Sequence, residues 1–155
     1  MKKTNYLLWI LASEAAGILS GLLSREGIAA YSATADKPGL TPPAILFPVV
    51  WTILYALMGI GAARVAAAPP GLARSRGLNV FVIQLILNFF WSLLFFNARA
   101  YGFAFLWILA LWAAIAAMIF WFGKVDRAAA LLQIPYLLWV SFAAYLNLAV
   151  WRLNR

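Results

Sequence analysis

The chain has 155 residues, of which 66% are hydrophobic, and it carries only 12 Lys or Arg and 4 Asp or Glu side chains. A soluble domain of this size is usually about half apolar and about a quarter charged, so the composition almost excludes a water-soluble globule. The sequence also contains no His and no Cys. Thiolate or imidazole metal sites, disulfides, and catalysis by His or Cys are therefore excluded.

The charged side chains separate five apolar runs. Crossing about 30 Å of hydrocarbon takes about 20 residues of helix, and each run is long enough to cross once. The sequence therefore predicts an all-α membrane protein, a single domain made of a bundle of five transmembrane helices. The predicted spans cover residues 5–24, 43–65, 78–97, 101–122 and 128–151.

The connection 25–42 is the longest between predicted spans and is rich in Gly and Pro. Connections of this length in a compact fold are often lids or binding loops, so we expect this one to act as a lid. The basic side chains are scattered over the segments that flank the spans and form no basic face. They indicate anchors beside lipid headgroups, and no nucleic-acid partner is predicted.

Polar and aromatic side chains share faces of three predicted spans, at spacings of three or four residues. A polar group in hydrocarbon is costly unless it finds a partner or a cavity, so these faces are where function is expected. The residues are Trp51 and Tyr55 in the second span, Gln84, Asn88 and Trp91 in the third, and Tyr136, Trp139, Ala143 and Asn147 in the fifth.

Two interpretations of these faces remain open. In the first, the amides tie the helices together and the rings fill the bundle. In the second, flat rings with sparse amides form the wall of a site for a large, planar, mostly apolar ligand.

Glu14 is the single acidic residue inside a predicted span. An ionisable group at that depth is a functional candidate. Three interpretations of Glu14 remain open. It is a proton-coupling carboxylate of a small-molecule exporter, a protonated acid, or the partner of a Ser or Tyr on another helix.

Three motifs, in order along nearly the whole chain, resemble the TspO/MBR family of tryptophan-rich sensory proteins, which includes the mitochondrial translocator protein or peripheral-type benzodiazepine receptor. The first motif contains Lys37-Pro38, Thr41-Pro42-Pro43, Phe47-Pro48, Trp51 and Leu54-Tyr55. The second contains Gln84, Leu87-Asn88, Trp91 and Phe95-Phe96, and the third contains Pro135-Tyr136-Leu137, Trp139, Leu146-Asn147 and the ending Val150-Trp151-Arg152-Leu153-Asn154.

The resemblance implies a five-helix bundle, often dimeric, in the bacterial cell membrane, with a pocket beneath the first long loop. It implies binding of porphyrins such as protoporphyrin IX and of isoquinoline or benzodiazepine ligands. The pocket residues carried over are Tyr31, Trp51, Tyr55, Asn88, Trp91, Trp139 and Ala143, and the polar face adds Gln84 and Asn147 to the predicted site.

The leading functional interpretation is a membrane receptor, sensor or carrier for porphyrins that needs no cofactor and no metal. A second is an enzyme that degrades porphyrin in light, because Trp51 and Trp139 match tryptophans linked to that activity in bacterial members. The exporter built around Glu14 is a third. The sequence departs from the family at Leu40, where a Trp is usual, and Tyr145 lies too far from Arg152 for the sterol-recognition pattern, so cholesterol binding is not predicted.

Overall fold

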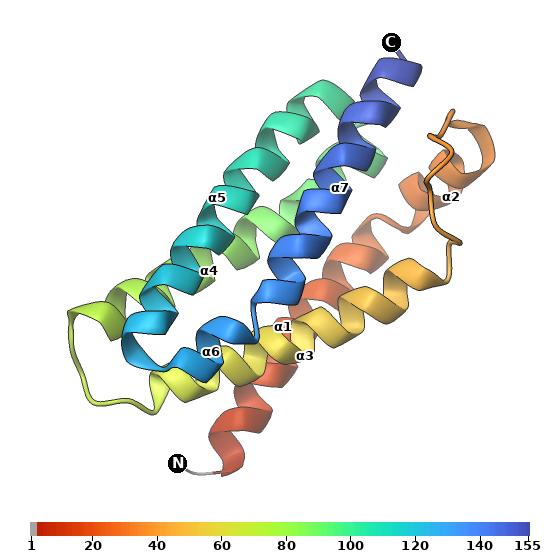
Figure 1. Ribbon diagram of the computed structural model, residues 1–155. Coiled ribbons are helices and arrows are strands. Elements are labelled where there is room, and N and C mark those ends of the chain that lie inside the picture. The colour runs from red at the N-terminus through yellow and green to blue at the C-terminus, as the bar shows by residue number, and fades with distance from the viewer. Residues whose placement is uncertain (1–2) are drawn as a thin grey trace.

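A computed structural model describes residues 3–155, and all of its regular elements in that range are helices (Figure 1). Five helical segments are long and apolar enough to cross a membrane. They are formed by α1 (Lys3–Leu23), α3 (Leu46–Ala66), α4 (Leu72–Ser92) with the π-helix η1 (Leu93–Asn97), α5 (Tyr101–Val125), and α6 (Arg127–Leu131) with α7 (Ile134–Leu153). The predicted five-helix membrane fold is confirmed. Helices are suited to the bilayer because they satisfy their own backbone hydrogen bonds where no water is present.

The connection between the first two spans is less irregular than its composition suggests. Its first part forms the ten-residue helix α2 (Arg25–Thr34), and only the segment from 35 to 45 lacks regular helix. The helix α2 has no buried residue and is far less apolar than the spans, so hydrophobic periodicity gives no signal for it. It is held in place by packing on η1.

Two helix pairs organise the bundle, and α5 connects one of them to the fifth span. Helix α1 packs along α3, α4 packs along α5, and α5 also contacts α6 and α7. The main core lies between α3, α4, α5 and α7 and includes Met58, Phe81, Ile115 and Phe122. Helix α1 contributes Trp9 to the edge of this core and leaves most of its own apolar side chains exposed, as expected for a helix that faces lipid.

Short polar contacts stabilise the end of the bundle that holds the N-terminus. Arg64 at the end of α3 forms an ion pair with Asp126, with 3.0 Å between Nε and Oδ2. The other carboxylate oxygen of Asp126 accepts a hydrogen bond from the Ala129 amide and caps α6. The fifth span is interrupted between α6 and α7, where Gln133 donates to the Leu57 carbonyl of α3.

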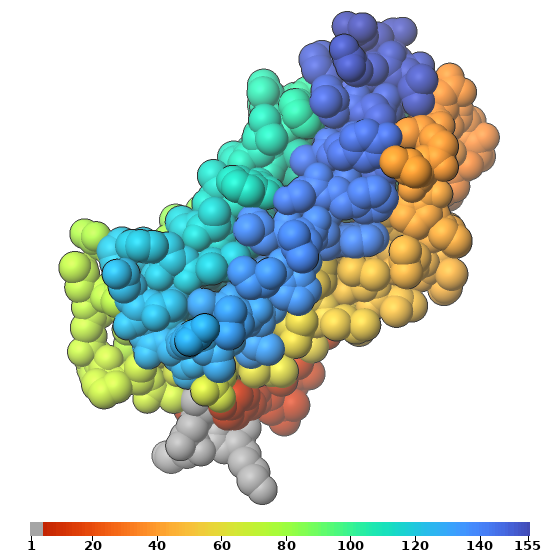
Figure 2. Space-filling view, viewed as in Figure 1, coloured from red at the N-terminus to blue at the C-terminus, as the bar shows by residue number. Residues whose placement is uncertain are grey.

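The opposite end of the bundle holds α2, the 35–45 segment and the C-terminal end of α7 (Figure 1). In the space-filling view the segment after α2 lies against the last turn of α7 (Figure 2), where the amide of Asp36 donates to the side chain of Asn154. The predicted lid therefore sits over one end of the aromatic interior.

Candidate functional site

A chain of hydrogen bonds joins three helices in the centre of the bundle. The Tyr55 hydroxyl of α3 donates to Oδ1 of Asn88 on α4. The Asn88 amide donates to the Tyr136 hydroxyl of α7 at 2.7 Å, and that hydroxyl donates to Oε1 of Gln84 at 2.7 Å. The Gln84 amide lies 3.8 Å from the Met58 sulfur. The two tyrosines and the two amides are all buried. Their polar groups therefore use one another as hydrogen-bond partners in place of water.

Trp51 lies directly beside this chain. Its ring centroid is 5.6 Å from that of Tyr55 and 6.2 Å from that of Tyr136, the latter nearly edge-on. The indole thus packs against the two phenols whose hydroxyls are engaged in the polar chain. This brings predicted site residues from the second, third and fifth spans into one cluster.

A second group is centred on Trp91 of α4. Its indole N–H donates to Oδ1 of Asn147 on α7 at 3.0 Å, and the Asn147 amide donates to the Tyr101 carbonyl at 2.8 Å. The Trp91 ring stacks on Phe95 with centroids 5.0 Å apart. Asn147 is buried, and it connects α4, α5 and α7 at the level of the lid.

Trp139 of α7 packs against the first turn of α3. Its ring packs edge-on against Phe47 of α3, with centroids 5.6 Å apart, and lies 5.7 Å from Phe142. Ala143, one turn further along α7, is also buried. The indole nitrogen of Trp139 is shielded from solvent, and it has no hydrogen-bond partner among residues 3–155. Buried N–H groups are nearly always paired, so this donor is exceptional.

The α3–α7 interface is filled by rings. Phe47, Trp51 and Tyr55 follow one face of α3, and Tyr136 and Trp139 follow the facing side of α7. The two backbones approach each other closely at few positions, because these large side chains stand between them.

Tyr31 approaches the same interior from the lid. Its ring packs edge-on against Phe95 and Phe96 at 5.3 and 5.2 Å, and the Lys37 ammonium lies 4.9 Å from its centroid. Burial, together with the nearby Tyr101, raises the pKa of the Tyr31 hydroxyl to about 12, so this residue is neutral at physiological pH. Tyr31 and Tyr101 help to line a cavity of about 270 Å³ under the lid.

The lid is attached to α7 through Asn154. Its side-chain carbonyl accepts the Asp36 amide at 3.1 Å, and its side-chain amide donates to the Asp36 carbonyl at 2.8 Å and to the Val150 carbonyl at 2.8 Å. On the other side, Lys37 donates to the carbonyls of Ser32 and Ala35. These bonds hold the segment over the cavity that contains Tyr31.

The predicted site residues therefore fall into two connected clusters. Tyr55 and Ala143 belong to the main core with Trp51, Trp91 and Trp139 packed against it, and Tyr31 joins the smaller lid-side core, which Trp91 also contacts. Gln84, Asn88 and Asn147 bond to protein groups and tie helices together. Their role as ligand contacts stays a prediction.

Sequence reasoning left Tyr136 out of the site, although its hydroxyl joins Asn88 and Gln84. Its spacing of three residues before Trp139 placed it on the correct face. Tyr101 was also missed, because it contributes a backbone carbonyl, for which sequence carries no signal.

Glu14 lies outside both clusters. It is half-buried on α1, three residues before Gly17, against which the Tyr55 ring packs. Within the described part of the chain it forms no hydrogen bond and no ion pair. The clusters themselves contain no charged side chain, and residues 3–155 hold no group of three or more acidic, His or Cys residues suited to a metal. The interior is chemically a neutral, aromatic wall with a few amide and hydroxyl groups.

Comparison with known proteins assigns the chain to a family. The model of the TspO/MBR family matches residues 9–152. The "Tryptophan-rich protein TspO" of Chlorobaculum tepidum is 41% identical over 127 residues, 80% of this chain and 79% of that protein. "Protein CrtK" of Rhodobacter capsulatus is 35% identical over 99% of this chain and 95% of its own length. The human "Translocator protein" is 37% identical over 83% and 77%.

The five membrane-spanning helices and these relatives agree with each other, and the bacterial relatives support the predicted bacterial cell membrane. The matched region includes every predicted site residue. This chain is a multi-pass integral membrane protein of the TspO/MBR family.

Proposed function

We propose that this protein is a membrane receptor or carrier that binds porphyrins, such as protoporphyrin IX, and related planar aromatic ligands between α3 and α7. The observation that carries the proposal is the Trp139 indole N–H, which is shielded from solvent and lacks an acceptor among the described residues. A carbonyl, carboxylate or ring nitrogen of a ligand placed beside Trp139 satisfies this donor.

The neutral aromatic surroundings support the same ligand class. Trp51, Tyr55 and Trp139 offer ring faces and edges, and planar aromatic ligands stack on such surfaces. No acid–base pair lies in the interior formed by the described residues, so hydrolytic chemistry is not proposed. Isoquinoline and benzodiazepine ligands are also flat and apolar, and we extend the proposal to them.

Ligand entry requires movement of the lid. The cavity beside Tyr31 has a volume of about 270 Å³, below the range of about 300–1,000 Å³ that is typical for sites of drug-sized ligands. The segment 35–45 lacks regular helix, and we propose that its outward movement, together with rotation of the rings between α3 and α7, enlarges the site.

The test is a spectral titration of the purified protein with protoporphyrin IX in the dark. We expect saturable binding, and we expect Trp139→Phe, which retains an aromatic ring and loses the N–H, to weaken it about two- to tenfold. Trp121→Phe is the matched control, since Trp121 packs beside Arg76 at the other end of the bundle. Equal losses in both variants, or no saturable binding by the native protein, contradict the proposal.

The names of the relatives point to two uses of such binding. One group is called sensory and another is called translocator, which corresponds to a receptor that reports its ligand or a carrier that moves it. Either role needs the ligand-binding wall that we propose between α3 and α7. Uptake of protoporphyrin IX into vesicles that contain the protein separates a carrier from a receptor.

A second candidate is light-dependent degradation of the bound porphyrin. It is favoured by the contacts of Trp51 with both Tyr55 and Tyr136. An indole that donates an electron to an excited porphyrin becomes a radical cation and leaves the porphyrin as a radical anion, and opening of the porphyrin ring then requires dissolved dioxygen as the oxidant. The hydroxyls of Tyr55 and Tyr136 are paired with amide oxygens of Asn88 and Gln84.

The test of this candidate is porphyrin absorbance against illumination time at equal pigment occupancy. Trp51→Phe retains the ring but is a poorer electron donor, so we expect slower light-dependent loss of pigment with nearly unchanged binding in the dark. Identical decay curves for the two proteins, or a curve that matches free pigment in detergent, contradict this activity and are consistent with binding alone.

A further inference from the structure

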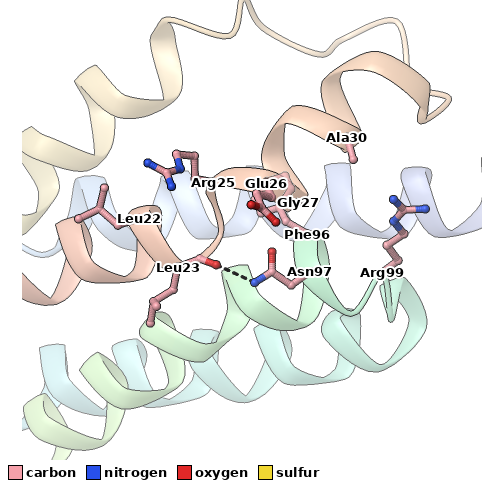
Figure 3. Close-up of a pocket in the computed structure, with 9 residues that line it drawn as sticks. All are labelled: Leu22, Leu23, Arg25, Glu26, Gly27, Ala30, Phe96, Asn97 and Arg99. Carbon is pink, nitrogen blue, oxygen red and sulfur yellow. Dashed lines mark hydrogen bonds between the residues drawn. The ribbon is translucent and has the colours of Figure 1, made fainter.

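A larger cavity adjoins the cavity of about 270 Å³ beside Tyr31, with which it shares Phe96 and Arg99. It has a volume of about 590 Å³ and is lined by the end of α1, the first turns of α2, and the end of η1 with the turn that follows (Figure 3). None of the predicted site residues lines it. We call it the α2–η1 cavity, and its function has no place in the proposal above.

Close contacts join the walls of this cavity. Gly27 of α2 lies so close to η1 that an added Cβ would come within 2.6 Å of the Phe96 carbonyl group. The Asn97 side-chain amide donates to the Leu23 carbonyl at 2.8 Å, which joins the end of η1 to the end of α1 (Figure 3). The cavity is therefore a built feature of the α1–α2–η1 junction.

The polar lining is cationic. Arg25 at the start of α2 and Arg99 after η1 reach the cavity from two separate elements, and Glu26 is the single acidic residue among those that line it (Figure 3). Two guanidinium groups are well suited to phosphate oxygens, which they bind through paired N–H donors. The lining thus carries a net positive charge, which favours the binding of an anion.

Arg99 has an unusual backbone. Its φ is 51°, in the left-handed region, and it is the single non-glycine residue with positive φ in the described range. This conformation is uncommon for side chains with a Cβ. Arg99 lies two residues after the end of the π-helix η1, and both features cluster at functional sites. The turn orients an arginine that lines both the α2–η1 cavity and the cavity beside Tyr31.

The apolar part of the lining identifies the source of the anion. Leu22 and Leu23 line the cavity and remain 58% and 52% exposed. They end the apolar span of α1 at Leu23, so the cavity lies where hydrocarbon meets headgroups. We propose that the α2–η1 cavity binds an anionic phospholipid, with the headgroup along the cationic lining, where Arg25 and Arg99 lie on either side of Glu26 (Figure 3), and acyl chains along Leu22 and Leu23.

The experiment is a titration of delipidated protein in non-ionic detergent with phosphatidylglycerol or with phosphatidylcholine of the same acyl chains, read by native mass spectrometry. We expect preferential binding of a phosphatidylglycerol molecule. We expect Arg25→Gln/Arg99→Gln to weaken it by about fivefold for each arginine removed. The matched control is Arg152→Gln/Arg155→Gln, which removes two cations from the same end of the bundle, neither of which lines the cavity.

Further variants separate loss of binding from loss of fold. Arg99→Gly removes the guanidinium and relieves the left-handed backbone, so its weaker lipid binding comes with an unchanged or higher melting temperature. Glu26→Gln removes the opposing charge, and we expect tighter phosphatidylglycerol binding. Equal weakening by the cavity and control doubles, or no effect of Glu26→Gln, overturns the proposal.

Two competition measurements distinguish other ligands. Displacement of phosphatidylglycerol by excess inorganic phosphate, beyond the effect of sodium chloride at equal ionic strength, means that the cavity is a free-anion site and overturns the lipid assignment. Displacement by protoporphyrin IX that depends on Arg25 and Arg99 assigns the cavity to porphyrin carboxylates and also overturns it. Failure of porphyrin binding at Trp139 leaves the lipid measurements unaffected, so the two proposals are tested separately.

Discussion

At the scale of single residues, the polar interior depends on groups that satisfy one another. The Tyr136 hydroxyl accepts from Asn88 and donates to Gln84, and the Tyr55 hydroxyl donates to Asn88. Each of these side chains comes from a helix that lipid surrounds, so no water replaces a missing partner. The arrangement specifies how α3, α4 and α7 face each other.

We predict that Tyr136→Phe lowers the free energy of unfolding by about 1–3 kcal/mol, because it leaves the Asn88 amide and the Gln84 carbonyl without a partner. Tyr145→Phe is the control, since Tyr145 is 44% exposed and its loss strands no buried group. Thermal melting in the same detergent measures both variants. A melting temperature for Tyr136→Phe equal to that of Tyr145→Phe contradicts the assigned role of the hydroxyl.

At the scale of helices, glycine determines how closely α1 approaches α3. A Cβ on Gly59 of α3 would lie 2.6 Å from the backbone nitrogen of Ile10 and 2.8 Å from the Trp9 carbonyl oxygen. The obstacle is backbone, so a side chain cannot rotate away from it. A Cβ on Gly21 of α1, in contrast, would have no heavy atom of a neighbouring element within 4 Å.

Gly59→Ala is therefore expected to separate α1 from α3 and to lower the melting temperature, with a cost of about 1–3 kcal/mol for overpacking. Gly21→Ala meets no neighbour and favours helix by about 0.5–1 kcal/mol, so it leaves the melting temperature unchanged or raises it. The two variants make the same chemical change in membrane-spanning helices. Similar melting temperatures for both contradict the close α1–α3 contact.

The lid is an element whose attachment rests largely on Asn154. We predict that Asn154→Ala accelerates both association and dissociation of protoporphyrin IX by several-fold, because each lost hydrogen bond to Asp36 contributes about 0.5–1.5 kcal/mol. Stopped-flow absorbance in the dark measures the rates, with Asn79→Ala, at a position on α4 away from the lid, as the control. Unchanged rates in Asn154→Ala exclude this contact as the step that limits ligand access.

At the scale of the whole molecule, the two ends of the bundle differ. One end is held by the Arg64–Asp126 ion pair and the cap of α6, and the other holds the lid, its cavity and the α2–η1 cavity. The neutral aromatic interior lies between them. The proposed ligand access therefore concerns the lid end, and the ion pair and helix cap lie at the opposite end.

A substitution at Glu14 tests whether the whole bundle works as a proton-coupled exporter. Glu14 lies outside the two aromatic clusters, so we predict that Glu14→Gln folds normally and binds protoporphyrin IX within about twofold of the native protein, since Glu14 forms no hydrogen bond or ion pair with a predicted site residue. The measurement is the dark titration, combined with substrate–proton exchange in vesicles. A folded Glu14→Gln protein that no longer binds porphyrin, or exchange that the native protein performs and the variant does not, supports the exporter.

Several features of the protein were predictable from sequence because the bilayer imposes them locally. A run of about 20 apolar residues must become a helix in hydrocarbon, and the positions of the charged residues separate five such runs. Helical spacing then places Trp51 with Tyr55, Asn88 with Trp91, and Tyr136 with Trp139 on shared faces. The membrane fold and the candidate wall of the site follow from these local rules.

Other features depend on which helices meet, and local pattern contains no information on that. The pairing of Tyr136 with Gln84 and Asn88 depends on how α7 faces α4, and the Asn154–Asp36 contact joins residues 118 positions apart. The helix α2 has no buried residue and low overall apolarity, so its packing on η1 decides its place. The unpartnered Trp139 nitrogen and the cationic α2–η1 cavity likewise arise from tertiary packing, because burial and enclosure are properties of several elements together.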